Sequence, residues 1–284
     1  MATPRCLACR LFRVRGWTHS PRAAAAAAVS IGSAAAWLGS SIRNKIYFPP
    51  SRDETICDET ILARALPDAH PDTVRVRRVA ADIVAAARED KVFGHRRLSE
   101  RTGHRLVHDI NWRVHVIDDD TWIRAFSTYN GEIVVFTGLL KRYCRKDGHL
   151  ATMLGHEVAH AIARHMQREF TKRFYVRVLA NFIEELLHAP VDGILQAVWV
   201  SLFMRPCLFS QELEADRAGI MLQAAAGYDP CDAPAFFKAH EPYEDLSNQY
   251  APARTHPTCK RRVQELMREH VLGEAMKVFG QAVE

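Results

Sequence analysis

Two histidines and a glutamate stand at a spacing that suits a catalytic metal ion. His156, Glu157 and His160 form the pattern H-E-x-x-H. The surrounding residues 150–164 are mostly apolar, with no proline and one glycine, and therefore predict a buried helix. Residues four apart lie on one helix face, so both imidazoles could reach one ion, with Glu157 beside a water molecule there. The simpler alternative is a helix with two incidental histidines and a solvated glutamate.

A catalytic zinc ion usually has three protein ligands, so the motif needs a third. One known extension of the motif, that of the metzincins, requires glycine and histidine where this chain has Ala163 and Met166, and is excluded. The other candidates are later glutamates, namely Glu184, Glu185, Glu212 and Glu214. We favour Glu212 because it begins the pattern E-x-x-A-D, in which Asp216 follows one helical turn later. Asp216 could accept a hydrogen bond from a ligand imidazole, although a charged, solvated helix would show the same residues.

Periodicity and turn residues predict an α+β domain, mostly helical, around these groups. Helices are expected over residues 61–67, 71–87, 138–143, 169–188, 211–225, 231–240 and 260–283. We expect Asp72 to cap the second of these and Gly273 to interrupt the last. Strands are expected over residues 112–117, 122–127 and 132–137, the last two joined at Asn130-Gly131 as a hairpin. Residues 241–254 suggest a polar loop, and the apolar run 194–204 suggests a core helix or, alternatively, a membrane-facing or lid segment near the site.

Positive charge is concentrated at the start of the chain. The net charge is +5, yet residues 1–52 hold eight Lys or Arg and no acid, whereas the rest holds 30 basic and 33 acidic residues. This distribution argues against a nucleic-acid-binding surface. The Arg-, Ala- and Ser-rich composition predicts that residues 1–46 are a transit peptide, a weak membrane anchor, or both. Residues 23–39 are short and weakly apolar for a spanning helix, which needs about 20 apolar residues.

Four motifs along the chain carry a family resemblance. They are IVVFTGLL (133–140), HEVAHAIARH (156–165), ELEAD (212–216) and THPT with Arg262 (255–262). In this order, over residues 72–265, they resemble the HtpX, CAAX-prenyl-protease and mitochondrial Oma-type zinc endopeptidases, gluzincins that are usually tied to membranes. The segment FTGLL (136–140) and the leader are most similar to those of the Oma-type branch. Residues 47–284 would then be a zinc metallopeptidase domain.

The resemblance implies roles for individual residues. His156, His160 and Glu212 would bind one Zn²⁺, and Glu157 would be the general base. His256, or alternatively Arg262, would lie near the developing oxyanion. The strand Glu132, Ile133, Val134, Val135 and Phe136 would be an edge strand of a small sheet that lines the cleft and pairs with the substrate backbone.

The resemblance also implies a cellular role. The substrates would be membrane-associated or misfolded proteins in organelle quality control, at the mitochondrial inner membrane or, alternatively, in a plastid. The protein is expected to associate with a membrane, and a homo-oligomer is compatible with the resemblance. No nucleic-acid partner is expected. The chain departs from the family at Arg124-Ala125-Phe126, where Asn-Ala-Phe is usual, and at Tyr129-Asn130-Gly131, where Pro-Gly-Gly is usual. These changes concern the substrate cleft and not the metal chemistry.

Two other functions compete with a zinc endopeptidase. A non-catalytic membrane-associated scaffold could hold a structural metal, but such a site would need no base at Glu157. A thermolysin-like secreted peptidase could use Glu184 or Glu185 as the third ligand, but the acid-free leader argues against secretion by that route.

Overall fold

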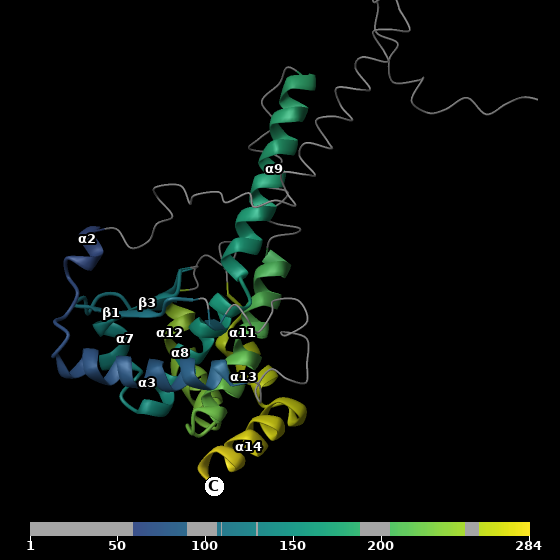
Figure 1. The fold of residues 1–284 in the computed structure, drawn as a ribbon. Helices are drawn as coiled ribbons and strands as arrows, with labels where there is room; N and C mark the ends of the chain where they lie inside the picture. The colour runs from purple at the N-terminus through teal and green to yellow at the C-terminus, as the bar shows by residue number, and fades with distance from the viewer. Residues whose placement is uncertain (1–58, 90–106, 109, 129, 188–204, 248–255) are drawn as a thin grey trace, which may run out of the picture. The chain divides into compact units, whose positions relative to one another are not determined.

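The computed structural model describes residues 59–89, 107–108, 110–128, 130–187, 205–247 and 256–284 (Figure 1). The chain divides into two compact units, Met1–Thr55 and Ile56–Glu284, and every described residue belongs to the second. The predicted leader over residues 1–46 and the apolar run 194–204 lie outside the described residues. Among the described helices, none is long and apolar enough to cross a bilayer.

Two helices from distant parts of the sequence form the centre of the domain (Figure 1). Helix α8 (Asp147–Ile162) contains the H-E-x-x-H motif, and helix α11 (Arg205–Ala225) contains Glu212 and Asp216. Each makes its most extensive contacts with the other. On α8, fully buried apolar side chains recur every three or four residues, at Leu150, Leu154 and Val158. The predicted motif helix is therefore confirmed, three residues longer at its start and two shorter at its end.

Glycine allows these two helices to approach closely. A Cβ atom on Gly155 would lie 2.7 Å from the carbonyl oxygen of Gly219, and one on Gly219 would lie 2.8 Å from the amide nitrogen of His156. Real Cβ contacts are almost never so short, so only glycine fits at both positions. Glu212 stands two helical turns before Gly219, on the same side of α11. The crossing therefore brings Glu212 towards the histidines of α8.

Helix α3 (Pro71–Arg88) packs against both α8 and α11. Its buried residues follow helical spacing and include Val76, Val79 and Ile83. Proline at its first position is well tolerated because that residue needs no helical N–H partner. The predicted cap was wrong: His70 is the N-cap residue, and its Nδ1 accepts a hydrogen bond from the backbone N–H of Asp72 at 3.2 Å.

The sheet has three strands, β1 (Arg113–Ile117), β2 (Ala125–Ser127) and β3 (Glu132–Phe136). Their order is β1-β3-β2, with β1 parallel and β2 antiparallel to β3. The predicted hairpin at Asn130-Gly131 is confirmed. Gly131 has φ +86°, a left-handed conformation that glycine adopts without strain.

The prediction that Glu132–Phe136 is an edge strand was wrong. β3 is the central strand, hydrogen-bonded on both sides, and its residues Ile133, Val134, Val135 and Phe136 are all buried. An uninterrupted apolar run is typical of a strand covered on both faces. The edges of the described sheet are β1 and β2, and β2 is the edge that packs against α8.

The other helices complete the domain and change several predicted bounds. They are α2 (Glu59–Leu62), α7 (Thr137–Arg142), α9 (His165–Leu187), α12 (Asp232–Ser247), α13 (Cys259–Leu266) and α14 (Glu269–Val283). Helix α12 continues to Ser247, so the polar loop predicted from residue 241 was wrong in its first part. The helical structure is interrupted at Met267 and Arg268, between α13 and α14. The interruption predicted at Gly273 was wrong, because Gly273 lies inside α14. Helix α9 begins four residues earlier than predicted.

Candidate metal centre

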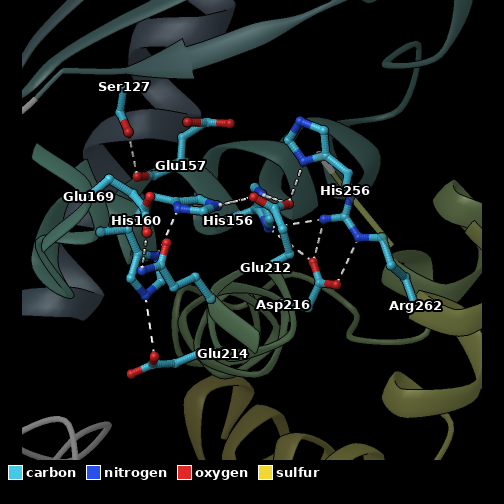
Figure 2. Close-up of polar contacts among 12 residues, drawn as sticks. Ser127, His156, Glu157, His160, Glu169, Glu212, Glu214, Asp216, His256 and Arg262 are labelled. Carbon is cyan, nitrogen blue, oxygen red and sulfur yellow. Dashed lines mark hydrogen bonds and ion pairs between the residues drawn. The ribbon is translucent and has the colours of Figure 1, made fainter. Parts of the chain in front are cut away.

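Two imidazoles and one carboxylate converge where α8 crosses α11 (Figure 2). The Nε2 atoms of His156 and His160 lie 2.9 Å apart. The Oε1 atom of Glu212 lies 3.3 Å from Nε2 of His160, and its Oε2 atom lies 3.5 Å from Nε2 of His156. Within the described part of the chain, this is the one group of His, Cys, Asp and Glu side chains placed closely enough to hold a metal ion.

The spacing and the unmet polar groups fit a divalent cation. Ligands about 2.1 Å from a tetrahedral zinc ion are about 3.4 Å from one another, close to the separations observed here. The Oε2 atom of Glu212 is buried and makes no hydrogen bond of regular geometry, although Nδ1 of His256 lies 2.8 Å away. The Nε2 atoms of His156 and His160 also face each other, so a cation between them would be within reach of both. A cation at the centre of the three side chains would satisfy all of these atoms.

Asp216 holds the ring of His156 from behind. Its Oδ1 lies 2.9 Å from Nδ1 of His156, on the side of the ring opposite the metal-facing Nε2. Arg262, from α13, donates from Nε to Oδ2 of Asp216 at 2.8 Å, and its guanidinium lies 3.8 Å from the ring centre of Phe237. Arg262 therefore supports Asp216, and its Nη2 atom also lies 3.1 Å from Nδ1 of His156. The role near the oxyanion that the resemblance implied for Arg262, as an alternative to His256, stays a prediction.

His160 has a different support, His165. The Nδ1 atoms of the two rings lie 2.8 Å apart, and Nε2 of His165 lies 3.3 Å from Oε2 of Glu214. His165 is only 3% exposed. Glu214, a candidate third ligand in the sequence, is thus turned to His165 and to Arg168 and stands outside the donor group. Glu184 and Glu185 lie near the end of α9, but their side chains are outside the described structure.

Glu157 directly follows His156 in α8, so its side chain points to the neighbouring face of the helix. Its side chain is buried, and Figure 2 draws no contact from its carboxylate to the other labelled residues. Its backbone carbonyl accepts a hydrogen bond from Oγ of Ser127 in β2 at 2.8 Å. This bond ties the edge strand β2 directly to the motif helix, next to the candidate base Glu157.

His256 approaches the centre from the segment before α13. Its Nδ1 lies 2.8 Å from Oε2 of Glu212, yet its side chain is 63% exposed. It is the one member of the candidate site that faces solvent to this extent. The structure therefore places His256 beside the donor group, with much of its side chain in solvent.

Comparison with known proteins agrees with this geometry. The model of peptidase family M48 matches residues 95–270, which span α8, α11 and the donor group. This chain belongs to peptidase family M48. The resemblance drawn from the four motifs is thereby confirmed, and the metal dependence of M48 peptidases agrees with the group formed by His156, His160 and Glu212.

Relatives of this M48 chain occur in plants, fungi and bacteria. It is 34% identical over 171 residues to the mitochondrial metalloendopeptidase OMA1 of Arabidopsis thaliana, covering 60% of this chain and 34% of that protein. It is 31% identical over 207 residues to the protein of the same name in Schizosaccharomyces pombe, covering 72% and 54%. It is 27% identical over 182 residues to the beta-barrel assembly-enhancing protease of Yersinia pestis, covering 57% and 36%. The chain spans about a third to a half of the length of these curated relatives.

Opposing effects set the charges in the M48 site. Burial and the nearby Arg262 guanidinium lower the pKa of His156, but the carboxylates of Asp216 and Glu212 outweigh them and raise this pKa to about 9. Burial raises the pKa of Glu212, and the surrounding histidines more than offset this effect, so the pKa lies well below its usual value. Glu212 is therefore ionised, and a bound cation would displace a proton from His156.

His165 is the residue of this M48 site that sequence reasoning missed. Five positions after His160, it would point about 140° away on a continuous helix. The chain instead bends between α8 and α9, where Arg164 adopts φ 52°. No glycine marks this bend, so the sequence carries no signal for it. Arg262 was named in advance, but its contact with Asp216 was not foreseen.

Proposed function

We propose that this chain is a zinc-dependent endopeptidase that hydrolyses peptide bonds of protein substrates. The supporting observation is that His156, His160 and Glu212 meet beside Glu157 in a member of peptidase family M48. Two imidazoles and one carboxylate are a common ligand set of catalytic zinc and leave a position for water or substrate. One zinc ion per chain is expected. A structural zinc site would normally supply a fourth protein ligand, which disfavours a non-catalytic scaffold.

Each residue of the centre has a role in this proposal. Zn²⁺ held there would polarise the scissile carbonyl and make an attacking water molecule more acidic. Glu157 accepts a proton from that water molecule while the water oxygen attacks the carbonyl carbon. Glu157 then delivers the proton to the leaving amine nitrogen. Asp216 keeps the His156 ring in place. His256, beside the donor group, donates a hydrogen bond to the tetrahedral oxyanion.

Within the described sheet, the outer edge of β2 suits substrate binding. Phe136 N–H donates to the carbonyl of Arg124, and Thr128 N–H donates to that of Glu132, so the residues that flank β2 on either side face β3. In an antiparallel ladder the alternate residues, Ala125 and Ser127, turn their N–H and C=O groups to the other edge. An extended peptide paired there would lie beside the motif helix, to which Ser127 is bonded. The substrate-pairing role expected of Glu132–Phe136 thus passes to β2.

The cellular setting is also part of the proposal. The relatives named OMA1 are called mitochondrial, and the Arg-rich, acid-free residues 1–52 suit a mitochondrial transit peptide. We place the protein at the mitochondrial inner membrane, where it would cleave membrane-associated or misfolded proteins. A plastid is the alternative location. Self-association remains compatible with this setting, and nucleic acid has no role in it.

A zinc and activity measurement on the full chain tests the function. The wild type should bind about one zinc ion and cleave an unfolded protein such as casein. Glu157→Gln should retain the zinc and lose about 10²-fold or more of the cleavage rate, because the amide cannot accept the proton. His160→Ala should lose both. The exposed Glu269→Gln on α14 is the matched control and should behave like the wild type.

Two results would contradict the function. Full cleavage by Glu157→Gln would remove the proposed base. A wild type that binds zinc and cleaves no protein substrate under any condition, while Glu157→Gln is indistinguishable from it, would favour the scaffold.

A further inference from the structure

The two candidate ligand histidines are supported in chemically different ways. His156 faces the carboxylate of Asp216, whereas His160 faces a second imidazole, that of His165. We propose that His165 is a positioning residue, which fixes the ring of His160 and its tautomer by accepting a hydrogen bond from it. This inference rests on the proposed zinc centre and adds a residue to it.

The direction of the hydrogen bonds follows from the position of His160. Its Nε2 lies 2.9 Å from Nε2 of His156 and so faces the metal position. A neutral imidazole that binds a metal through Nε2 carries its proton on Nδ1. That proton needs an acceptor, and Nδ1 of His165 is 2.8 Å away.

His165 can accept only if its own proton is on Nε2. Oε2 of Glu214 lies 3.3 Å from that atom and can accept this proton's hydrogen bond. Glu214 is in turn 3.5 Å from the guanidinium of Arg168, which also donates to the carbonyl of Ala163 at 2.7 Å. The chain of bonds thus runs from His160 through His165 to Glu214. It selects one tautomer at each ring.

The backbone places His165 for this contact. Helix α8 ends at Ile162, Arg164 adopts a left-handed φ of 52°, and α9 begins at His165 itself. On a straight continuation of α8, a residue five positions after His160 would lie about 140° round the axis. The bend brings the ring of His165 back against that of His160, with the ring centres 4.7 Å apart. His165 is buried there, and its Nε2 contacts Glu214.

Zinc affinity tests the inference without relying on activity. Asn and Leu have nearly the same shape, but only Asn offers an oxygen near the position of Nδ1 in His165. His165→Leu in the full chain should weaken zinc binding by about 10- to 100-fold, as loss of a ligand's hydrogen-bond partner usually does. His165→Asn should stay within a few-fold of the wild type. Competition with a chromophoric chelator measures the affinities, and thermal unfolding without zinc reports the fold.

A control and a milder variant accompany this pair. His149 is a partly buried histidine on α8, three helical turns before His160, whose Nδ1 contacts the carbonyl of Tyr143 at 2.9 Å. His149→Asn should leave zinc affinity unchanged. Glu214→Ala, at a half-exposed position, should fold even if His165→Leu does not, and should weaken zinc binding by a smaller factor because His165 loses its preferred tautomer.

The outcomes separate this inference from the proposed function. If His165→Leu and His165→Asn both bind zinc like the wild type, or both are weakened equally, His165 does not act through an accepted hydrogen bond and the inference is overturned. If the wild type binds no zinc, or if His160→Ala binds as tightly as the wild type, the zinc centre itself is wrong and the inference falls with it.

Discussion

Arg262 donates from Nε to Oδ2 of Asp216 at 2.8 Å; the Asp216 side chain is 1% exposed and that of Arg262 11%. The other oxygen of Asp216 contacts Nδ1 of His156. A charge on α13 thus reaches the motif helix both through a carboxylate on α11 and directly, since Nη2 of Arg262 lies 3.1 Å from Nδ1 of His156. The effect is electrostatic as well as geometric, because Arg262 keeps the pKa of the buried Asp216 below its usual value against the effect of burial. An ionised Asp216 is the stronger acceptor for the His156 ring.

Replacing Arg262 alone should destabilise the fold more than replacing Arg262 and Asp216 together. Arg262→Met leaves the Asp216 carboxylate buried without its cation, which typically costs about 3–5 kcal/mol of unfolding free energy. The double variant Arg262→Met/Asp216→Asn should recover part of this loss, because the uncompensated charge is gone. Urea unfolding of the zinc-free proteins measures both values. A double variant that loses more stability than Arg262→Met alone would show that the two residues act independently.

The glycine contact between α8 and α11 should control both stability and the metal centre. In Gly219→Ala the new Cβ meets the backbone at His156, so the helices must separate, at a cost of about 1–3 kcal/mol. Zinc affinity should fall as well, since Glu212 moves with α11. Gly273 in α14 has open space around it, and Gly273→Ala should be neutral or stabilising by up to about 1 kcal/mol. Thermal unfolding and zinc titration compare the two variants; an unaffected Gly219→Ala would contradict the close packing.

The outer edge of β2 should contribute a hydrogen bond to the substrate. Ala125→Pro removes the outward N–H of this edge strand without removing a bond to β3, a place where proline is tolerated. Loss of one backbone hydrogen bond should lower kcat/KM for a peptide substrate by about tenfold, with zinc content unchanged. Ala125→Gly retains the N–H and should resemble the wild type. Equal kcat/KM in the proline and glycine variants would show that the substrate does not pair with this edge.

Asp147, at the start of α8, should make stability depend on acid pH. It bonds Nε of Arg75 at 2.6 Å and also contacts Arg78, and these arginines outweigh burial and hold its pKa below the usual value. A lowered folded-state pKa stabilises the protein fully above the unfolded pKa of about 3.9, and the effect disappears as pH falls through the folded value. Because the group is partly exposed, the expected difference from Asp147→Asn is about 1 kcal/mol or less.

Thermal unfolding of the wild type and Asp147→Asn across acid pH, with a chelator present, checks this dependence. The difference between the two proteins should be constant above pH of about 5 and should shrink below about 4. The exposed Asp68→Asn serves as the control at a surface ion pair with Arg77. A stability difference between the wild type and Asp147→Asn that increased as the pH fell would contradict the lowered pKa of Asp147.

Local periodicity determined much of this protein from the sequence alone. The spacing of four between His156 and His160, and again between Glu212 and Asp216, sets neighbours on one helix face whatever the rest of the chain does. The helices, the hairpin at Asn130-Gly131 and the family resemblance follow from patterns of this kind. The choice of Glu212 over Glu214 also came from such a pattern, and the structure places Glu212 in the donor group.

Only the tertiary structure decided which distant elements meet. The strand order β1-β3-β2 depends on a parallel pairing of β1 with β3, which a hairpin pattern cannot reveal. The contact of His165 with His160 depends on a bend at Arg164, and that of Arg262 with Asp216 on the packing of α13. These contacts are set by long-range packing and by single backbone angles. Short-range sequence patterns report propensities and faces, but they carry no information on which faces come together.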